Sequence, residues 1–231
     1  MARNFTSAGE LSTNTNWTLG ATPLSMACWF YSSDTTSVFY LQNALDVDIS
    51  DSFLLRANAG NVEALTVAAG NVSTAVTTAG YSSGVWNHAA AVWTSATDRA
   101  AFLNGGSKGT EATSRTPSGI DRVGLAGRRT SGTGDVALAE IGVWDIALAD
   151  ADVARLAAGL SPLLVRPASL VACWPIRALS TEIDVVGGFG MAPAGSSSAF
   201  AHPRIVMPHS QYIPSRPAGN RRRRVIMSRA G

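Results

Sequence analysis

The first 148 residues alternate between short apolar runs and polar segments rich in Gly, Ser, Thr, Asn and Asp. The apolar runs recur about every ten residues, which is the spacing of strands in a β-sandwich or barrel. Within several runs the apolar and polar side chains alternate, as they do in a strand with one buried face. The pattern predicts strands within the stretches 25–32, 37–43, 52–58, 62–70, 72–80, 85–94, 99–106, 121–127 and 136–144.

A different pattern begins at residue 147. The segment 147–160 has apolar residues at helical spacing, and Asp150 and Asp152 near its start complement exposed backbone amides and the helix dipole. One more strand-like run, "SLVACWPI", follows two prolines. From His202 four prolines fall within fifteen residues, a density that prevents a sheet interior and favours an extended arm.

The composition fits one large all-β domain or two small ones. The chain has 231 residues, of which 46% are hydrophobic and 15% are charged. No apolar run reaches the roughly 18 residues of a membrane span, and the first 17 residues lack the apolar core of a secretory signal. We therefore expect a protein that is made in the cytoplasm and binds no membrane. If it works outside a cell, it gets there by another route, such as release inside a particle.

Charge is divided unevenly along the chain. Residues 202–231 contain seven Arg and no acidic residue, whereas residues 1–201 contain 11 basic and 16 acidic residues, a net charge of −5. A basic tail on a mildly acidic body predicts that the tail binds an acidic partner.

Several motifs resemble, in their order and spacing, those of laminin-G-like, concanavalin A-like jelly-roll domains. Trp86 and His88 match a Trp-x-His strand, 103–105 match a strand that ends in Asn-Gly, and 141–148 match an Ile-Gly-x-x-Trp-Asp-x-x-Leu segment that runs into a short helix. The stretch "LSMACWFYS" is similar to a family strand that ends in Ala-x-Trp-Phe. The resemblance covers roughly residues 1–160 and implies an antiparallel jelly-roll β-sandwich with one short helix.

One piece of the resemblance stands in an unusual place. In many such domains a strand resembling Leu-Val-Ala-x-Trp-Pro and an Asp-x-x-Gly-Gly turn come first, whereas here the matching piece is 170–195. We expect its strand, 170–176, to pair near the sheet edge and to complete the core. The expected core residues are Val171, Cys173 and Ile176. The chain then divides into a jelly roll over 1–201 and an extended arm over 202–231.

Family members with such a late segment and a Pro-rich "HPRI" sequel resemble structural proteins of tailed bacterial viruses. The resemblance implies a non-enzymatic virion protein, such as a capsid decoration protein or a head or tail accessory protein, whose jelly roll is anchored by the arm. Its partners would be other virion proteins, such as the major capsid or tail protein, and further copies of itself. The alternative is a carbohydrate-binding module for receptor binding or adhesion, which would contact a surface glycan.

The stretch "STEIDVVGG" at 180–188 resembles half of an active site. Jelly-roll glucanases use a Glu-x-Asp-x-Glu strand, and a retaining mechanism needs two carboxyl groups roughly 5–5.5 Å apart. Glu182 and Asp184 are present, but Val186 or Gly187 takes the place of the second Glu, and no acidic residue follows in the chain. We therefore predict a structural turn here and no enzyme activity.

The other candidate metal and catalytic residues have structural interpretations. His88 lies mid-strand with no second His nearby, so we interpret it as part of the sheet. Cys28 and Cys173 are predicted to be buried free thiols, with a disulfide as the alternative. Three aspartates alternate as calcium ligands can, but the Gly and final Glu of an EF-hand loop are missing, so a solvated strand face is expected, with calcium as the alternative and no other cofactor. They are Asp46, Asp48 and Asp51.

Two sets of residues are candidates for contact with a ligand or partner. Trp17 and Tyr81 lie in polar segments and are the expected exposed aromatics that could stack on a sugar. The end of the arm combines arginines, which pair bidentately with carboxylates, with an apolar triplet that can anchor in a pocket. Nucleic-acid binding, which would have no interleaved aromatics to stack on bases, and a solvated tail are the alternatives. The docking residues are Arg216, Arg221, Arg222, Arg223, Arg224, Val225, Ile226 and Met227.

Overall fold

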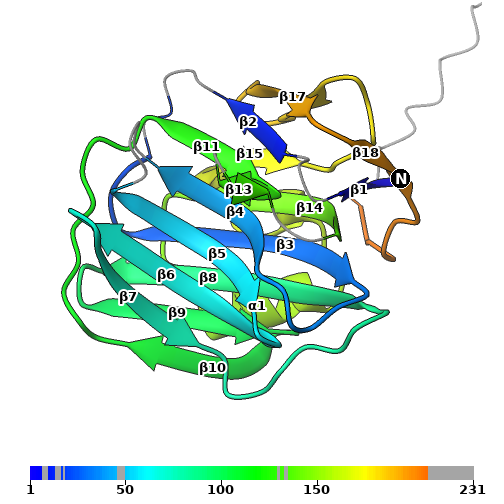
Figure 1. Cartoon of the computed structure of the whole chain (residues 1–231). Coiled ribbons are helices and arrows are strands. Elements are labelled where there is room, and N and C mark those ends of the chain that lie inside the picture. The colour runs from blue at the N-terminus through cyan, green and yellow to red at the C-terminus, as the bar shows by residue number, and fades with distance from the viewer. Residues whose placement is uncertain are drawn as a thin grey trace, which may run out of the picture.

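The computed structural model describes residues 1–6, 10–13, 17, 19–45, 50–128, 131–132 and 135–207. In this part of the chain, strands dominate and form two large antiparallel sheets that pack face to face (Figure 1). The predicted fold class, an antiparallel jelly-roll sandwich with one short helix, is confirmed.

The first sheet is built from strands of both chain ends and the middle of the chain. Its strands are β1 Ala2–Phe5, β3 Leu24–Ser32, β8 Trp86–Ser95, β9 Asp98–Leu103, β10 Gly106–Glu111, β14 Val136–Trp144, β15 Leu170–Trp174 and β18 Ser197–Phe200. Across the sheet the order is β10-β9-β8-β3-β14-β1-β18, and β15 also pairs with β14.

The second sheet faces the first. Its strands are β2 Glu10–Thr13, β4 Phe39–Leu45, β5 Ser52–Asn58, β6 Asn61–Ala68, β7 Asn71–Val76, β11 Arg122–Leu125, β16 Glu182–Ile183 and β17 Gly190–Ala194, and their order is β16-β17-β2-β11-β4-β5-β6-β7. A separate pair joins β12 Gly127–Arg128 to β13 Ser131–Gly132. Each of the nine stretches predicted as strands overlaps one of these strands.

The main core lies between the two sheets, because each strand turns its alternate apolar side chains inward. Trp93 on β8 shows how the sheets are joined. Its ring packs edge-on against Phe53 of β5 at 5.4 Å, and its Nε1 donates a 2.8 Å hydrogen bond to the hydroxyl of Thr66 on β6. A buried indole thus has both an apolar contact and a partner for its one donor.

The predicted helix forms α1, Asp150–Ala157, and is shorter than the predicted 147–160. Ala149 is extended, with ψ of 155°, and Gly159 has φ of +95°, so the backbone leaves helical geometry on both sides. Val153 and Leu156 form a second, smaller core with Trp144 on the outer face of the first sheet. The helix therefore covers apolar side chains that the sheet would otherwise expose.

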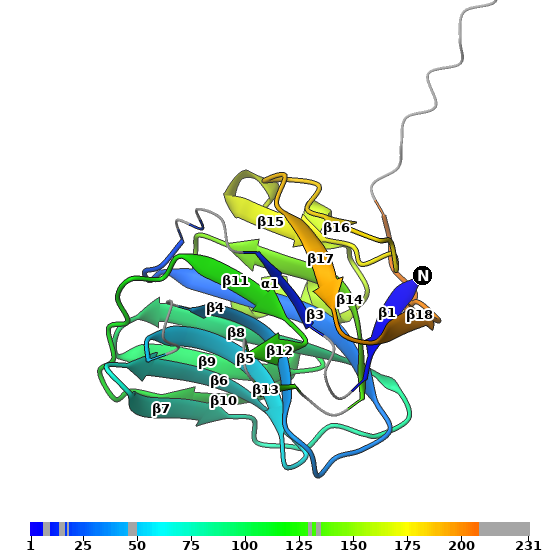
Figure 2. The same ribbon diagram turned by 45° about the horizontal axis from the view of Figure 1, so that its top comes forward.

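The late segment completes both sheets, as Figure 2 shows. β15 pairs antiparallel with β14, with Trp174 opposite Ile141, while β18 pairs with β1 and β17 pairs with β2. The late strand therefore lies at a sheet edge, as predicted. The expected core residues are confirmed for Cys173 and Ile176, whereas Val171 is half-buried.

The predicted division at residue 201 stays a prediction, but the first residues beyond it contact the body. The backbone amide of Val206 donates a 2.7 Å hydrogen bond to the carbonyl of Gly159, and the amide of Ser161 donates back to Val206 at 3.0 Å. Residues 204–206 therefore lie along the loop that follows α1.

A buried ion pair ties the N-terminal strand to the late segment. Arg3 on β1 and Glu182 on β16 are 5% and 1% exposed, and the guanidinium lies 3.0 Å from the carboxylate Oε1. The guanidinium also donates to Ser197 Oγ at 2.6 Å and to the carbonyl of Leu179. Arg3 thus bonds to residues that follow it by more than 170 positions in the chain.

Loss of this pair should cost more stability than loss of an exposed pair. Glu182→Ala leaves the Arg3 charge buried without a counterion, so we expect the free energy of unfolding to fall by about 3–5 kcal/mol. Lys108→Ala, which breaks the exposed Lys108–Asp150 pair, should cost about 1 kcal/mol or less. Urea unfolding followed by tryptophan fluorescence measures both, and equal losses would contradict the structural role of the buried pair.

Candidate functional site

The two glucanase-like carboxylates, Glu182 and Asp184, both accept hydrogen bonds from other parts of the chain. Asp184 is 2% exposed; its Oδ1 accepts hydrogen bonds from the amides of Cys173 and Val186 at 2.7 and 2.9 Å, and its Oδ2 accepts from Gly187 at 2.8 Å. Glu182, besides its pair with Arg3, accepts from backbone amides in the preceding loop. Asp184 therefore closes a structural turn, as predicted.

The third acid of the glucanase motif would fall at Val186 or Gly187. Val186 stands there, is 43% exposed and carries no titratable group. The two acids that remain are buried, and their oxygens accept hydrogen bonds from the protein. A carboxyl pair that is free to donate a proton to a sugar and to attack it is not formed by Glu182 and Asp184.

The expectation that Trp17 and Tyr81 are exposed is wrong. Trp17 is 3% exposed and packs against Trp174 and Phe189, with ring centroids 6.4 and 5.4 Å away. Tyr81 is 6% exposed and lies edge-on to Phe30, and burial raises its pKa to about 12. Each ring also donates a hydrogen bond to a backbone carbonyl. Polar sequence neighbours were misleading because each aromatic folds inward from its loop and covers part of the core.

His88 and the cysteines have the structural roles that the sequence predicts. His88 is 2% exposed and packs edge-on against Trp29, and burial lowers its pKa to about 3, so the ring is neutral at physiological pH. Cys28 and Cys173 are buried free thiols, and burial raises the pKa of both. A thiol that cannot ionise is not a nucleophile.

The candidate calcium stretch is described only at Asp51. Its carboxylate is 8% exposed and accepts hydrogen bonds from the amides of Ala69 and Ser118 at 3.1 and 2.7 Å, so it joins two loops. Asp46 and Asp48 lie outside the described residues. Within the described ranges, no group of three or more His, Cys, Asp and Glu side chains could hold a metal ion.

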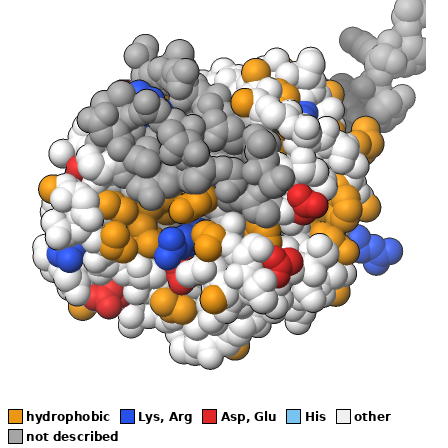
Figure 3. Space-filling model, viewed as in Figure 1, with side chains coloured by type: hydrophobic (Ala, Val, Ile, Leu, Met, Phe, Trp, Pro, Cys, Tyr) orange, Lys and Arg blue, Asp and Glu red, His pale blue; other side chains and the backbone are white. Residues whose placement is uncertain are grey.

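A hollowed apolar surface surrounds the base of the arm; we call it the arm-base face. Two adjoining cavities of about 520 and 220 Å³ lie on it and share Pro175, Arg177 and Leu179. In Figure 3, hydrophobic side chains lie at the right of the view, where Figure 1 places β17, β18 and the N-terminus. Exposed apolar side chains that gather in this way typically mark an interaction site. The exposed apolar side chains that line the two cavities are Met1, Leu179, Ile183, Val185 and Met207.

His202 holds the arm to the floor of the larger cavity. Its Nε2 lies 3.4 Å from the carboxylate Oε1 of Glu140, which is buried, and 3.4 Å from the carbonyl of Pro175; its Nδ1 lies 2.8 Å from the carbonyl of Pro203. Both ring nitrogens thus face acceptors, which suits the doubly protonated ring. Burial alone would lower the pKa of His202, but the contact with Glu140 and the carbonyls outweighs it and raises the pKa.

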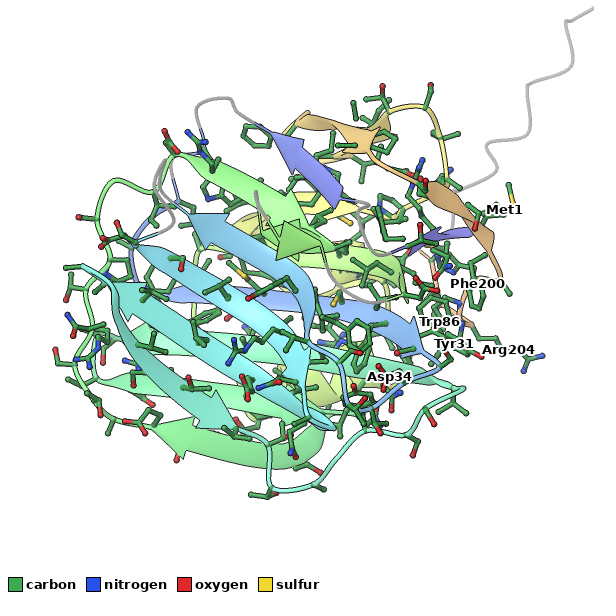
Figure 4. All side chains as sticks on the ribbon, in the orientation of Figure 1. Met1, Tyr31, Asp34, Trp86, Phe200 and Arg204 are labelled. Atoms are coloured by element: carbon green, nitrogen blue, oxygen red, sulfur yellow. The ribbon has the colours of Figure 1, made fainter. Side chains whose placement is uncertain are left out.

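Three half-buried aromatic side chains form a second surface feature, the aromatic trio. Tyr31 of β3 and Trp86 of β8 lie opposite each other in the sheet, and Phe200 of β18 packs against both, with centroids 4.9 to 6.0 Å apart (Figure 4). The trio was not predicted from the sequence, because β3 and β8, the strands of Tyr31 and Trp86, both contain long apolar runs. Alternation was the available signal: Phe30 faces the core, so its neighbour Tyr31 must face outward.

Comparison with known protein families identifies the superfamily of this chain. The model of the concanavalin A-like lectin/glucanases superfamily matches residues 5–154, which is more than half of the chain. The chain belongs to this superfamily. A search of curated protein sequences finds no match.

Solved structures show the same concanavalin A-like fold at low sequence identity. A heptameric SAP-like pentraxin from Limulus polyphemus has a TM-score of 0.53 and 17% identity over 68% of this chain and 81% of that one. The receptor-binding domains of botulinum neurotoxin C/D mosaic serotype and of botulinum neurotoxin D have TM-scores of 0.54 and 0.53, each with 12% identity over 68% of this chain. The match spans only 42% and 44% of those toxin chains.

Two further sequence predictions concern the end of the arm and the membrane. The docking residues named at the end of the arm, from Arg216 to Met227, all lie outside the described residues and stay a prediction. Among the described residues, no helix is long and apolar enough to cross a membrane.

The attachment of residues 202–207 to the concanavalin A-like body should depend on pH. Because the folded pKa of His202 is raised above its ordinary value of about 6.5, protonation stabilises the attached state fully below that value, and the stabilisation is lost as pH rises through the folded pKa. We expect the Val206 amide, which bonds to Gly159, to exchange hydrogen more slowly, relative to its intrinsic rate, at about pH 5.5 than at about pH 8.

His202→Gln is the test variant, and the Ala158 amide, which bonds to Ala154 within the end of α1, is the internal reference. The variant should lose the pH dependence at Val206 while Ala158 stays unchanged. The same pH dependence at Val206 in the variant would show that another group controls the attachment.

Proposed function

We propose that the protein is a non-enzymatic structural protein of a tailed bacteriophage virion, a capsid decoration protein or a head or tail accessory protein. The observation that carries the proposal is the position of the arm-base face. The chain continues toward its basic end from Met207, which is itself one of the exposed apolar residues of that face. A partner that binds the arm would therefore meet the apolar face of the body as well.

The chemistry of the face fits a protein partner. Arg177 is exposed and lines both cavities, and Arg204 is exposed on the arm. Protein interfaces combine apolar side chains with arginine in this way. The residues beyond 202 add basic charge only, so the complementary partner surface would be apolar with acidic groups at its margin. In a symmetric particle, many such contacts act together, and modest single contacts give firm attachment.

The carboxylates support a binding role over catalysis. Glu182 and Asp184, the acids that most resemble a glucanase site, stabilise the turn between β15 and β17 and are buried there. Because these two buried acids are not available for catalysis, the sandwich serves as a scaffold that presents binding surfaces. Many jelly rolls are used in this way.

Deletion of residues 208–231 tests the arm. Every described contact of residues 202–207 remains, so the truncated protein should keep its melting temperature. Its incorporation into particles, measured by quantitative mass spectrometry of purified virions, should fall by about tenfold or more, because the arm supplies part of each contact. Undiminished incorporation would contradict the proposed anchoring.

A matched pair of variants tests the face separately. Ile183→Glu places a charge on the arm-base face, and Val72→Glu places one on β7, in the other half of the second sheet; the two wild-type side chains are 57% and 54% exposed. Only Ile183→Glu should reduce incorporation. Equal effects would show that the face makes no specific contact.

The aromatic trio favours a second candidate function, carbohydrate binding. Partly exposed aromatic rings at a sheet surface can stack on a sugar ring, and the superfamily includes lectins. The carbohydrate alternative then rests on Tyr31, Trp86 and Phe200, because Trp17 and Tyr81 are buried.

If the trio binds a sugar, Trp86→Ala should abolish binding on a glycan array, because the largest ring of the three is removed. Val85→Ala, which shortens the 49% exposed neighbour of Trp86, is the matched control and should bind as the wild type does. A bound glycan that is insensitive to Trp86→Ala would place the sugar elsewhere.

A further inference from the structure

Arg177 is an exposed charge in the wall of both cavities of the arm-base face. Within the described part of the chain its guanidinium forms no ion pair within 4.0 Å and donates no hydrogen bond. The acids in the same walls, Glu140 and Glu182, are 3% and 1% exposed. Glu182 is paired with Arg3 and Glu140 lies beside His202, so both carboxylates already have partners other than Arg177.

The backbone on both sides of Arg177 is strained. Ile176 and Ala178 have φ of +54° and +57°, in a region that L-residues rarely adopt, and β-branched ones least of all. The amides of Arg177 and Leu179 donate to the two carboxylate oxygens of Glu182 at 2.8 and 3.1 Å and so fix the loop in this conformation. Ile176 is thereby buried, while Arg177 is turned outward. Strained backbone of this kind is frequent at sites that bind a ligand or partner.

Apolar side chains surround this charge. Leu179 lines both cavities, Ile183 and Val185 line the smaller one, and Met1 and Met207 line the larger one. The smaller cavity, of about 220 Å³, has the volume of roughly seven water molecules in the liquid, which is enough for one apolar side chain of a partner.

The charge limits which partner can cover this face. A partner that does so removes water from Arg177, and a guanidinium that is buried without a counterion is unfavourable. Since the acids in the cavity walls are buried and paired within the chain, the partner has to bring an acidic group of its own.

We propose that Arg177 anchors the partner of the arm-base face by binding one carboxylate, that of an Asp or Glu side chain flanked by apolar side chains. The inference rests on the proposed function, because it names the partner chemistry at the same face. The planar fork of a guanidinium donates to both oxygens of a carboxylate. An arginine within an apolar patch that loses its water on binding is also typical of the residues that dominate protein interfaces.

A nucleic acid fits the face less well than an acidic protein segment does. Its phosphates are held by several basic groups, whereas Arg177 is the one exposed basic side chain among the described residues that line the cavities. The apolar side chains around it would have no counterpart on a phosphate backbone.

Titration of the isotope-labelled full-length chain with short peptides tests the anchor. One peptide has a Glu between two Leu residues, and the second has Gln in place of the Glu. The Glu peptide should shift the NMR signals of the Arg177 Nε–H group and of the Leu179 amide. Its half-saturation concentration should be about tenfold below that of the Gln peptide, because only the carboxylate forms a charge-assisted fork.

Equal half-saturation concentrations for the two peptides, or no shift at either group, would overturn the proposal. A short DNA duplex that shifts the same signals at lower concentration than the Glu peptide would overturn it as well, because the face would then recognise phosphates.

Variants show whether Arg177 carries the preference for the Glu peptide. Arg177→Gln should remove the preference, and Arg177→Lys, which keeps the charge without the fork, should retain only part of it. Neither substitution removes the amide that bonds to Glu182, so both variants should keep the wild-type melting temperature. Arg155→Gln is the matched control, because this arginine lies on α1 with a side chain that is 53% exposed, and it should keep the full preference. A preference that persists in Arg177→Gln would place the carboxylate elsewhere.

Incorporation into virions separates this inference from the proposed function. Arg177→Glu should reduce incorporation by about tenfold or more, because it sets like charges against each other, whereas Arg155→Glu should not. If Ile183→Glu reduces incorporation and Arg177→Glu does not, the anchor is wrong and the proposed function stands. If the wild type does not enter particles but the Glu peptide binds at Arg177, the anchor stands and the virion role is wrong.

Discussion

The architecture depends on how one edge of β14 is covered. An uncovered strand edge has free amides and carbonyls that can pair with another chain. Here β1, of four residues, pairs with the first part of this edge, and β15, of five residues, pairs with the second part. Neither could cover the nine residues of β14 alone. The sheet is complete only when both ends of the chain are in place, and the Arg3–Glu182 pair links them.

This arrangement also explains where the interaction surface lies. The late segment must cross from the first sheet to the second to supply β15, β16 and β17, and the loops of this crossing leave Leu179, Val185 and Val186 exposed. The apolar side chains of the arm-base face are therefore a by-product of closing the sandwich. They stand beside the start of the arm because β18 is the last strand that the closure needs.

The sequence predicted the strands that have a strong pattern of their own. It also predicted the Asp184 turn and the buried thiols, because a carboxylate before Gly-Gly and a Cys within an apolar run each have one dominant structural use. Among the strands that it missed are β1, β2, β10, β17 and β18, most of whose residues are small or polar. They are strands because a neighbouring strand offers hydrogen bonds. It misplaced Trp17 and Tyr81 because loop composition does not say which way a ring turns.

The hydrogen bonds of Val206 determine how mechanical load would enter the body. The arm passes Gly159 and Ser161 before it reaches β18, so tension on the arm is applied first to these two bonds and then to the strand pair of β18 and β1. Beyond β1 the load passes to β14, which lies inside the sheet with a partner on each side. Force thus passes from the edge strand β18 through β1 to a strand inside the sheet.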